Sequence, residues 1–334
     1  MGIITLAHGS GGKSTHELIG KIFYRYFNNE VLLQQGDSSI VNNLAGKIAV
    51  TTDSYIVSPM FFPGGDIGKL SVCGTVNDLA VSGAKPLYIT AGFIIEEGLE
   101  INTLEKVVIS MSETAKSCGV KIIAGDTKVV EKGKGDKLYI NTTGLGIFEK
   151  GYEISDKGIE AGDKVIVSGT LGDHGMTILS QREEINFETE IQSDCCSLQW
   201  LIKDILEVSS NIKFIRDITR GGLATTLNEA VVDTKHSIII EEKSILVRED
   251  VKFLCEILGL DPLYIANEGK AMVIVSKEDA AKVLFTMRKN PQGKDSQVIG
   301  EIVKDDKGMV FVKTHINGTR VVGMAEGELI PRIC

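Results

Sequence analysis

The sequence predicts a two-domain protein of mixed α/β or α+β class, and three observations lead to this prediction. The chain has 334 residues, against the ~150 residues of an average domain. Apolar strand-like runs alternate with helix-like segments in both halves. A glycine-rich, charged stretch at 150–163 separates the halves. We therefore expect domains at 1–150 and 151–325, followed by a mobile tail at 326–334.

Within the first half, apolar spacing predicts helices and strands in alternation. Apolar residues at helical spacing indicate a helix over 14–27, and an apolar run rich in small residues indicates a buried helix over 68–82. The third expected helix, 103–118, ends at Gly119, a residue type suited to a helix C-terminus. The expected strands are 47–52, 86–95, 120–124 and 138–148.

The second half repeats this style without a short tandem repeat. Its expected strands are 164–168, 237–241, 271–276 and 309–313, and its expected helices are 174–182, 197–208 and 278–288. The last residues have no periodicity and contain a proline, so they predict an extended tail that can reach up to ~30 Å.

Composition excludes several classes of protein. The formal net charge is −9 and no Lys/Arg cluster is present, which argues against nucleic-acid binding. No apolar run approaches the ~20 residues of a membrane span, and the N-terminus does not resemble a secretory signal. The six cysteines form no Cys-x-x-Cys pair, so we expect reduced thiols in the cytoplasm and no zinc site.

A glycine-rich segment, AHGSGGKS at 7–14, precedes the first helix. Glycines and a helix N-terminus favour phosphate, but Ala7 stands where the phosphate-binding loop motif needs glycine. The segment, with Lys13, therefore indicates either a lid near a nucleotide or a plain N-terminal loop.

Four aspartates suggest a cation site: Asp37, Asp53, Asp78 and Asp126. Two of them, Asp53 and Asp126, directly follow apolar runs, and carboxylates at strand ends face the crevice where α/β folds bind ligands. Grouped carboxylates repel one another unless a cation joins them, and Mg²⁺ prefers oxygen ligands shared with phosphates. Any one of them alone would be read as a turn residue or a helix cap.

Asp78 stands out because it lies in an otherwise uncharged stretch from Leu70 to Ala84. A charge buried there needs a partner or a metal, and the flanking Asn77 is placed to orient it or a substrate.

Three charged, glycine-flanked segments occur in the second half: GTLGDHG at 169–175, RDITRGGL at 216–223 and ANEGK at 266–270. Arg216 and Arg220 are candidate phosphate contacts. His174 is equally compatible with a packing role and a functional one.

Taken together, these motifs resemble the HypE family of hydrogenase maturation proteins. The resemblance runs from His8 to Cys334 and rests on GDSSIV, TTDSYIVSPMFFPGGDIGKL, GTVNDLAVSGAKPLY, GDTKVV, the three segments above and the terminal PRIC. The aspartate pattern is shared with the aminoimidazole ribonucleotide synthetase, selenophosphate synthetase and thiamine monophosphate kinase superfamily, whereas PRIC separates the HypE family from those relatives.

The resemblance implies a two-domain fold like that of aminoimidazole ribonucleotide synthetase, with an N-terminal sheet that forms a homodimer and ATP in a nearby cleft. It implies that the partner HypF carbamoylates Cys334, that ATP drives dehydration of the S-carboxamide to an S-cyanide, and that cyanide passes to iron held by HypC–HypD for a [NiFe]-hydrogenase centre. Asp37, Asp53, Asp78 and Asp126 are then the candidate Mg²⁺ and ATP ligands, Lys128 stabilises the transferring phosphoryl group, and Glu268 is the candidate base or amide-orienting group.

Two other functions remain open from the residues themselves. One is a small-molecule kinase or synthetase of the same superfamily, and the other is a non-enzymatic thiol carrier or scaffold in which the aspartates are structural. The terminal thiol of Cys334 would be incidental in the first and would ferry a group in the second.

Overall fold

A computed structural model of the chain describes residues 2–34, 38–41, 46–149, 151–152, 154, 158–182, 190–232, 234–305, 307–327 and 330–334. Their strands form a four-stranded sheet, a seven-stranded sheet and a two-stranded sheet. The four-stranded sheet uses residues from 48 to 147 and the seven-stranded sheet residues from 164 to 322, so each half of the chain has its own sheet.

The first sheet has the spatial order β1-β6-β4-β5, with β4 and β5 parallel and the other pairs antiparallel. Its strands are β1 (Ile48–Tyr55), β4 (Lys85–Glu96), β5 (Lys121–Val130) and β6 (Leu138–Ile147). Helices α3 (Ile67–Val81) and α4 (Ile101–Cys118) pack on one of its faces. The short strands β2 (Phe61–Phe62) and β3 (Gly65–Asp66) form the small sheet just before α3.

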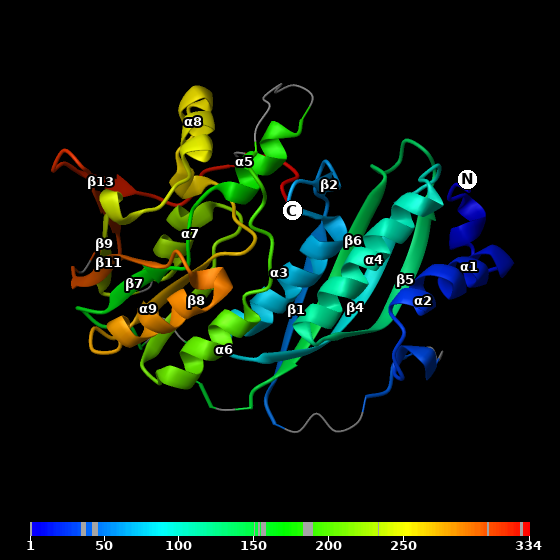
Figure 1. Cartoon of the computed structure of the whole chain (residues 1–334), viewed down its shortest axis with the longest axis horizontal. Coiled ribbons are helices and arrows are strands. Elements are labelled where there is room, and N and C mark those ends of the chain that lie inside the picture. The colour runs from blue at the N-terminus through cyan, green and yellow to red at the C-terminus, as the bar shows by residue number, and fades with distance from the viewer. Residues whose placement is uncertain are drawn as a thin grey trace.

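Helix α3 is the centre of the molecule. Figure 1 shows it between the first sheet and the second domain. All of its residues except Lys69 and Asp78 are buried, and it contacts both β1 and β8 of the second domain. The side chain of Asp66 caps its first turn, accepting hydrogen bonds from the main-chain N–H groups of Gly68 and Lys69.

N-terminal to the first sheet, one helical stretch lies beyond β5. It consists of η1 (Leu6–Gly9), α1 (Lys13–Leu18), the π-helical turn η2 (Ile19–Phe23) and α2 (Tyr24–Tyr26), followed by η3 (Leu32–Gln34). The aromatic ring of Phe23 packs against Phe93 of β4, with ring centroids 4.8 Å apart, and ties this stretch to the sheet.

The second sheet has the spatial order β13-β12-β9-β11-β7-β10-β8. Its strands are β7 (Lys164–Val167), β8 (Ile212–Asp217), β9 (His236–Glu241), β10 (Ala271–Val275), β11 (Gln297–Lys304), β12 (Val310–Lys313) and β13 (Thr319–Val322). Its helices are α5 (Asp173–Ser180), α6 (Gln199–Val208), α7 (Gly222–Glu229), α8 (Glu249–Leu258) and α9 (Ala280–Lys289), with short turns η5 (Glu242–Ser244), η6 (Pro262–Tyr264) and η7 (Pro291–Gly293).

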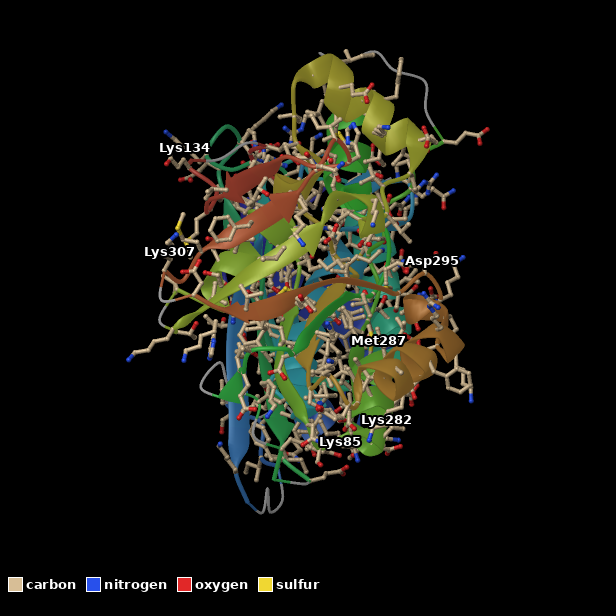
Figure 2. The ribbon with its side chains drawn as sticks, turned by 90° about the vertical axis from the view of Figure 1, so that its left-hand side faces the viewer. Lys85, Lys134, Lys282, Met287, Asp295 and Lys307 are labelled. Atoms are coloured by element: carbon tan, nitrogen blue, oxygen red, sulfur yellow. The ribbon has the colours of Figure 1, made fainter. Side chains whose placement is uncertain are left out.

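Figure 2 views the second domain from its outer side, with Met287 and Lys282 of α9 at one edge and Lys307, in the turn before β12, at the other. Helices α6 and α9 pack together over one face of the sheet, where Met287 is fully buried. No helix within the described ranges has the length and apolar character needed to cross a membrane.

Two predicted strand ends are wrong. The strands expected at 47–52 and 120–124 continue to Tyr55 and Val130, so Asp53 and Asp126 lie within strands rather than beyond them. Main-chain pairing with β6 and with β4 continues along both extensions, and it carries each carboxylate inside its strand. The other predicted elements are present within a few residues, whereas β2, β3, β8, α7, α8, β11 and β13 were not predicted.

Candidate functional site

The carboxyl groups of Asp53 and Asp78 meet between β1 and α3. Every second residue of β1 faces α3: Thr51 donates to Asp78 Oδ2 at 2.6 Å, and the Tyr55 hydroxyl lies 3.4 Å from Thr75 Oγ1. Gly74 permits this approach, because a Cβ there would collide with the Tyr55 hydroxyl. The strand and the helix are thus close enough to bring the two carboxyl groups into hydrogen-bonding contact.

The electrostatics of this pair are unusual. Burial, the charge of Asp78 and the hydrogen bond with Asp78 together raise the pKa of Asp53 to about 6, and Arg220 opposes them. Asp53 Oδ2 is buried and has no hydrogen-bond partner among the described residues. Two adjacent carboxyl groups with a spare buried oxygen form a site that a cation would stabilise.

A groove of about 810 Å³ opens beside this pair, between the two domains. Residues 47–51 of the first domain line one wall and residues 214–220 of the second line the other. Asp217, the last residue of β8, faces it, and burial followed by the charge of Asp78 raises its pKa to about 7. Arg216 and Arg220 also line the groove, and Arg216 forms an ion pair with Glu229 at 2.9 Å. The volume suits a nucleotide-sized ligand.

Glu268 adds a further buried acid on the side of the second domain. Its side chain is 4% exposed, and Oε1 has no hydrogen-bond partner among the described residues. Burial, then the charges of Asp194 and Asp217, raise its pKa well above the usual range, and Arg220 works in the opposite direction. A buried acid with a raised pKa near charged partners is typical of proton-transfer sites.

Asp194 holds the loop that carries Glu268. It accepts hydrogen bonds from the main-chain N–H groups of Glu268 and Gly269 at 3.1 Å and from Lys270 Nζ at 3.0 Å. Burial alone would raise the pKa of Asp194, but Lys270 and the loop N–H groups outweigh it and hold the pKa below its usual range. Glu268 is therefore fixed through its backbone while its carboxyl group stays unpaired.

The described end of the tail, residues 330–334, is docked between the domains, and Figure 1 places the C-terminus beside β2 and α5. The main-chain N–H of Ile56, which directly follows β1, donates to the carbonyl oxygen of Cys334 at 3.0 Å. Asp53 lies three residues earlier in the chain, so the docked tail ends beside the strand that carries one of the acidic groups. The sequence did not indicate where the tail rests.

Asp126 and Lys128 lie on the opposite face of the first sheet. They form an exposed ion pair with 3.3 Å between Lys128 Nζ and Asp126 Oδ1. Asp126 aligns with Gly92 of β4, and β4 and β6 separate β5 from β1. Three strand spacings of about 4.8 Å each place them about 14 Å from Asp53 within one chain. The predicted grouping of Asp126 with Asp53 and Asp78 is therefore wrong for a single chain.

Two further predicted residues, Lys13 and Asn77, do not line the groove. Lys13 is exposed at the start of α1, with its Nζ 3.9 Å from Glu17. Asn77 is buried, accepts from the Leu198 N–H at 2.7 Å and donates to the Cys196 carbonyl at 3.1 Å, so it joins α3 to the second domain. Asp37 lies outside the described residues.

Mg²⁺ fits the Asp53–Asp78 pair, because it is usually held by one or two carboxylates together with phosphates. The described part of the chain has no group of three or more His, Cys, Asp or Glu side chains arranged to hold a metal alone. A cation shared with a ligand would give Asp53 Oδ2 a partner, since this atom has none among the described residues. It would also offset the repulsion between the carboxyl groups of Asp53 and Asp78.

Comparisons with known proteins agree with this arrangement. The family model of the AIR synthase related protein, N-terminal domain, matches residues 36–148, and that of the C-terminal domain matches residues 160–313. The carbamoyl dehydratase HypE of Bradyrhizobium diazoefficiens is 48% identical over 334 residues, which cover 100% of this chain and 96% of that protein.

Solved structures give the same result. A hydrogenase maturation protein HypE in complex with ATP is 45% identical and superposes with a TM-score of 0.94, covering 98% of this chain and 99% of the other. A chain from a HypE–HypF complex is 47% identical, with a TM-score of 0.81 over 92% of this chain and 99% of the other. The chain therefore belongs to the HypE family of carbamoyl dehydratases, enzymes built from the two AIR synthase related domains.

Proposed function

We propose that the chain uses ATP to dehydrate a carboxamide carried on the Cys334 sulfur to an S-cyanide. The observation that carries this proposal is the docked tail, which ends with Cys334 at the backbone of Ile56, three residues from Asp53. A terminal residue with no catalytic role has no reason to be held by main-chain hydrogen bonds at the edge of an acidic, domain-lining groove.

ATP lies in the groove between residues 47–51 and 214–220, with its phosphates toward Asp53 and Asp78. An acidic site accepts phosphates only with a compensating cation; Asp53 and Asp78 would hold Mg²⁺, which would supply that positive charge beside the phosphates. Arg220, on the opposite wall, contributes a fixed positive charge.

The reaction balances without a further reagent. The carbamoyl oxygen attacks the γ-phosphorus, the bond from that phosphorus to the ADP oxygen breaks, and one N–H proton leaves. The C–O bond then breaks, phosphate departs, and loss of the second N–H proton gives the carbon–nitrogen triple bond.

Glu268 is the acceptor for an N–H proton. Its raised pKa makes its carboxylate a stronger base than an exposed glutamate, and the absence of a described partner for Oε1 leaves an acceptor atom available. Asp194 positions it by holding the backbone of its loop.

Lys128 and Asp126 act across a homodimer. The open face of the first sheet carries exposed apolar side chains: Ile94 aligns with Lys128, and Ile48 and Val50 lie at the start of β1. A second copy of the chain packed on this face brings its Lys128 toward the phosphates bound by the first copy. Within one chain, Lys128 is three strand spacings from Asp53 and cannot reach those phosphates.

The tail also serves partners. A relative at 47% identity is named for its complex with HypF, and HypF is the expected source of the carbamoyl group, with HypC–HypD as the acceptor of cyanide. Each transfer requires Cys334 to leave its docked position, so the tail alternates between docked and free states in the cytoplasm.

The proposal is tested with Cys334→Ala after exposure to a carbamoyl-charged partner. The variant should bind ATP as the wild type does and should show no carbamoyl-dependent ADP release, because the carrier atom is absent. Equal ADP release from both proteins would instead support a kinase or synthetase acting on a free substrate. Dehydration that survives Asp78→Asn unchanged would support a carrier with a structural aspartate cluster.

A further inference from the structure

Four consecutive carbonyl groups at the end of the chain are each held by a hydrogen bond. Arg182 donates to those of Pro331 and Arg332, the main-chain N–H of Ser58 also donates to that of Arg332, His174 binds that of Ile333, and Ile56 N–H donates to that of Cys334. Residues 56–58 belong to the first domain and residues 174–182 to the second, so both domains form hydrogen bonds with the tail. Within this set, His174 is the only donor among the described residues that is fully buried.

The hydrogen-bond network fixes which nitrogen of His174 carries the proton. Burial lowers the pKa of His174, so the ring is neutral and has one N–H. The Ile333 carbonyl oxygen can only accept, so the ring nitrogen that faces it must carry the hydrogen. His174 Nδ1 then accepts from Ser193 Oγ at 2.8 Å, and that oxygen also accepts from the Cys195 N–H at 3.1 Å. The ring hydrogen therefore lies on Nε2, which donates to the Ile333 carbonyl oxygen at 2.7 Å.

The side chain of Ile333 is accommodated by a matching socket. Gly175, which follows His174 in α5, has no side chain, and a Cβ there would lie 3.2 Å from Ile333 Cδ1 and would collide with Ile265. Phe62 packs edge-on against the His174 ring, with centroids 5.4 Å apart. The backbone of Ile333 is held by a hydrogen bond and its side chain by packing. These contacts restrict the positions that the next residue, Cys334, can adopt.

The same short segment that orients His174 also orients the proposed proton acceptor. Ser193 fixes the imidazole, and its neighbour Asp194 holds the loop of Glu268. The Ser193 N–H in turn donates to the Pro63 carbonyl at 2.9 Å, which anchors the segment to the first domain. One segment therefore sets the positions of Cys334 and Glu268 relative to each other.

We infer that His174 is a positioning residue for the reacting tail: its Nε2–H holds the Ile333 carbonyl and so keeps Cys334 in the docked state in which dehydration occurs. This inference rests on the proposed function for its catalytic consequence but not for the docking itself. Carbamoylation by the partner uses the undocked tail and does not need His174.

Docking is measured without catalysis, by the rate at which iodoacetamide alkylates Cys334 in the unmodified, full-length protein, followed by peptide mass. His174→Ala should raise this rate roughly tenfold, because a buried carbonyl loses its donor. His174→Gln, whose amide nitrogen can occupy the place of Nε2, should restore protection to within about threefold of wild type. His236→Ala, a change at a histidine of β9 in the second sheet, should leave the rate unchanged.

Catalysis is then measured as single-turnover dehydration of carbamoyl-loaded protein. His174→Ala should slow it by a factor similar to the loss of docking, with ATP affinity and the rate of carbamoylation unchanged, and His174→Gln should recover it. If His174→Ala does not fold, Ser193→Ala removes the hydrogen bond that orients the His174 ring and should raise the alkylation rate severalfold.

Cys334 reactivity within twofold of wild type in a folded His174→Ala or Ser193→Ala protein would overturn the inference, as would equal impairment by Ala and Gln. Absence of dehydration in the loaded wild type would contradict the proposed function and would leave the alkylation result to decide the docking role alone.

Discussion

The two faces of the first sheet place similar carboxylates in opposite environments. On the inner face Asp53 is pressed against α3, shares a hydrogen bond with Asp78 and keeps a buried oxygen without a described partner. On the open face Asp126 is exposed and paired with Lys128. Burial therefore accounts for the difference. The buried Asp53 can bind a cation or accept a proton, whereas the charge of the exposed Asp126 is already stabilised by water.

A further contrast lies in the apolar residues. The inner face is completed by α3 and α4 within one chain, whereas the open face exposes Val50 by 65%. The inner face can therefore be tested with single-site variants of one chain, and the open face needs tests that depend on a second copy.

The largest effect is expected at Glu268. Glu268→Gln removes a buried proton acceptor, so single-turnover dehydration should fall on the order of 10³-fold while ATP still binds. Glu242→Gln, a change at a glutamate in η5 of the second domain, is the control and should leave the rate unchanged. A loss of less than tenfold at Glu268 would move the acceptor role to another group.

The next effect is on stability. Asp194→Asn breaks a buried pair with Lys270 and should lower the free energy of unfolding by about 3 kcal/mol near neutral pH. The matched change on the open face, Asp126→Asn, should cost less than about 1 kcal/mol. Urea unfolding of both variants measures the difference, and equal losses would contradict the contrast between a buried and an exposed carboxylate.

The pH dependence of that stability follows from the sign of the shift. The pKa of Asp194 is lower in the folded chain than in the unfolded chain, so its contribution is complete above an unfolded value of about 4 and is lost as pH falls through the folded value. Asp194→Asn should therefore flatten the acid limb of the wild-type stability curve.

The third effect concerns the cation. Asp78→Asn leaves Asp53 without its paired carboxylate, so the Mg²⁺ concentration needed for half-maximal ATP turnover should rise by roughly 10- to 100-fold. Asp126→Asn should raise this Mg²⁺ concentration by a smaller factor. If the two variants shift the Mg²⁺ requirement equally, the open-face carboxylate is as much a cation ligand as the buried pair.

The smallest effect tests the second copy by complementation. Glu268→Gln and Lys128→Ala are each expected to be inactive alone. If Lys128 acts on the partner's site, a re-equilibrated equal mixture should recover about a quarter of wild-type activity, because half of the dimers are mixed and each has one intact site. No recovery would place both residues in the same chain's site.

The exposed apolar surface itself can be tested separately. Val50→Glu should convert the dimer to a monomer in sedimentation velocity, and Ile257→Glu, at a comparably exposed position in α8, should not. A monomeric wild type would contradict the homodimer.

Much of this architecture could be predicted from the sequence because its signals are local. The helical spacing before Gly119 and the apolar run that forms α3 predicted the bounds of α4 and α3 to within two residues. Gly119 adopts the left-handed conformation that ends a helix. Strand β8 and helices α7 and α8 were not predicted, because their short, mixed segments form only against the second sheet and its neighbours.

The site was predictable as a set of residue types but not as a geometry. Asp53, Asp78 and Glu268 do lie near one another, whereas the strand-end argument wrongly placed Asp126 with them, since no local signal tells which face of a strand a carboxylate occupies. The roles of Asp194 and His174 depend on hydrogen bonds across more than 70 residues, to the Glu268 loop and to Ile333, which spacing in the sequence cannot indicate.

The most direct test of the account is the intact mass of the protein after loading with a carbamoyl-charged partner and addition of ATP and Mg²⁺. The account predicts a gain of one carbamoyl group on Cys334, followed by ATP-dependent loss of the mass of one water from that same residue. A stable carbamoyl adduct that never loses water, while ATP is hydrolysed, would contradict it.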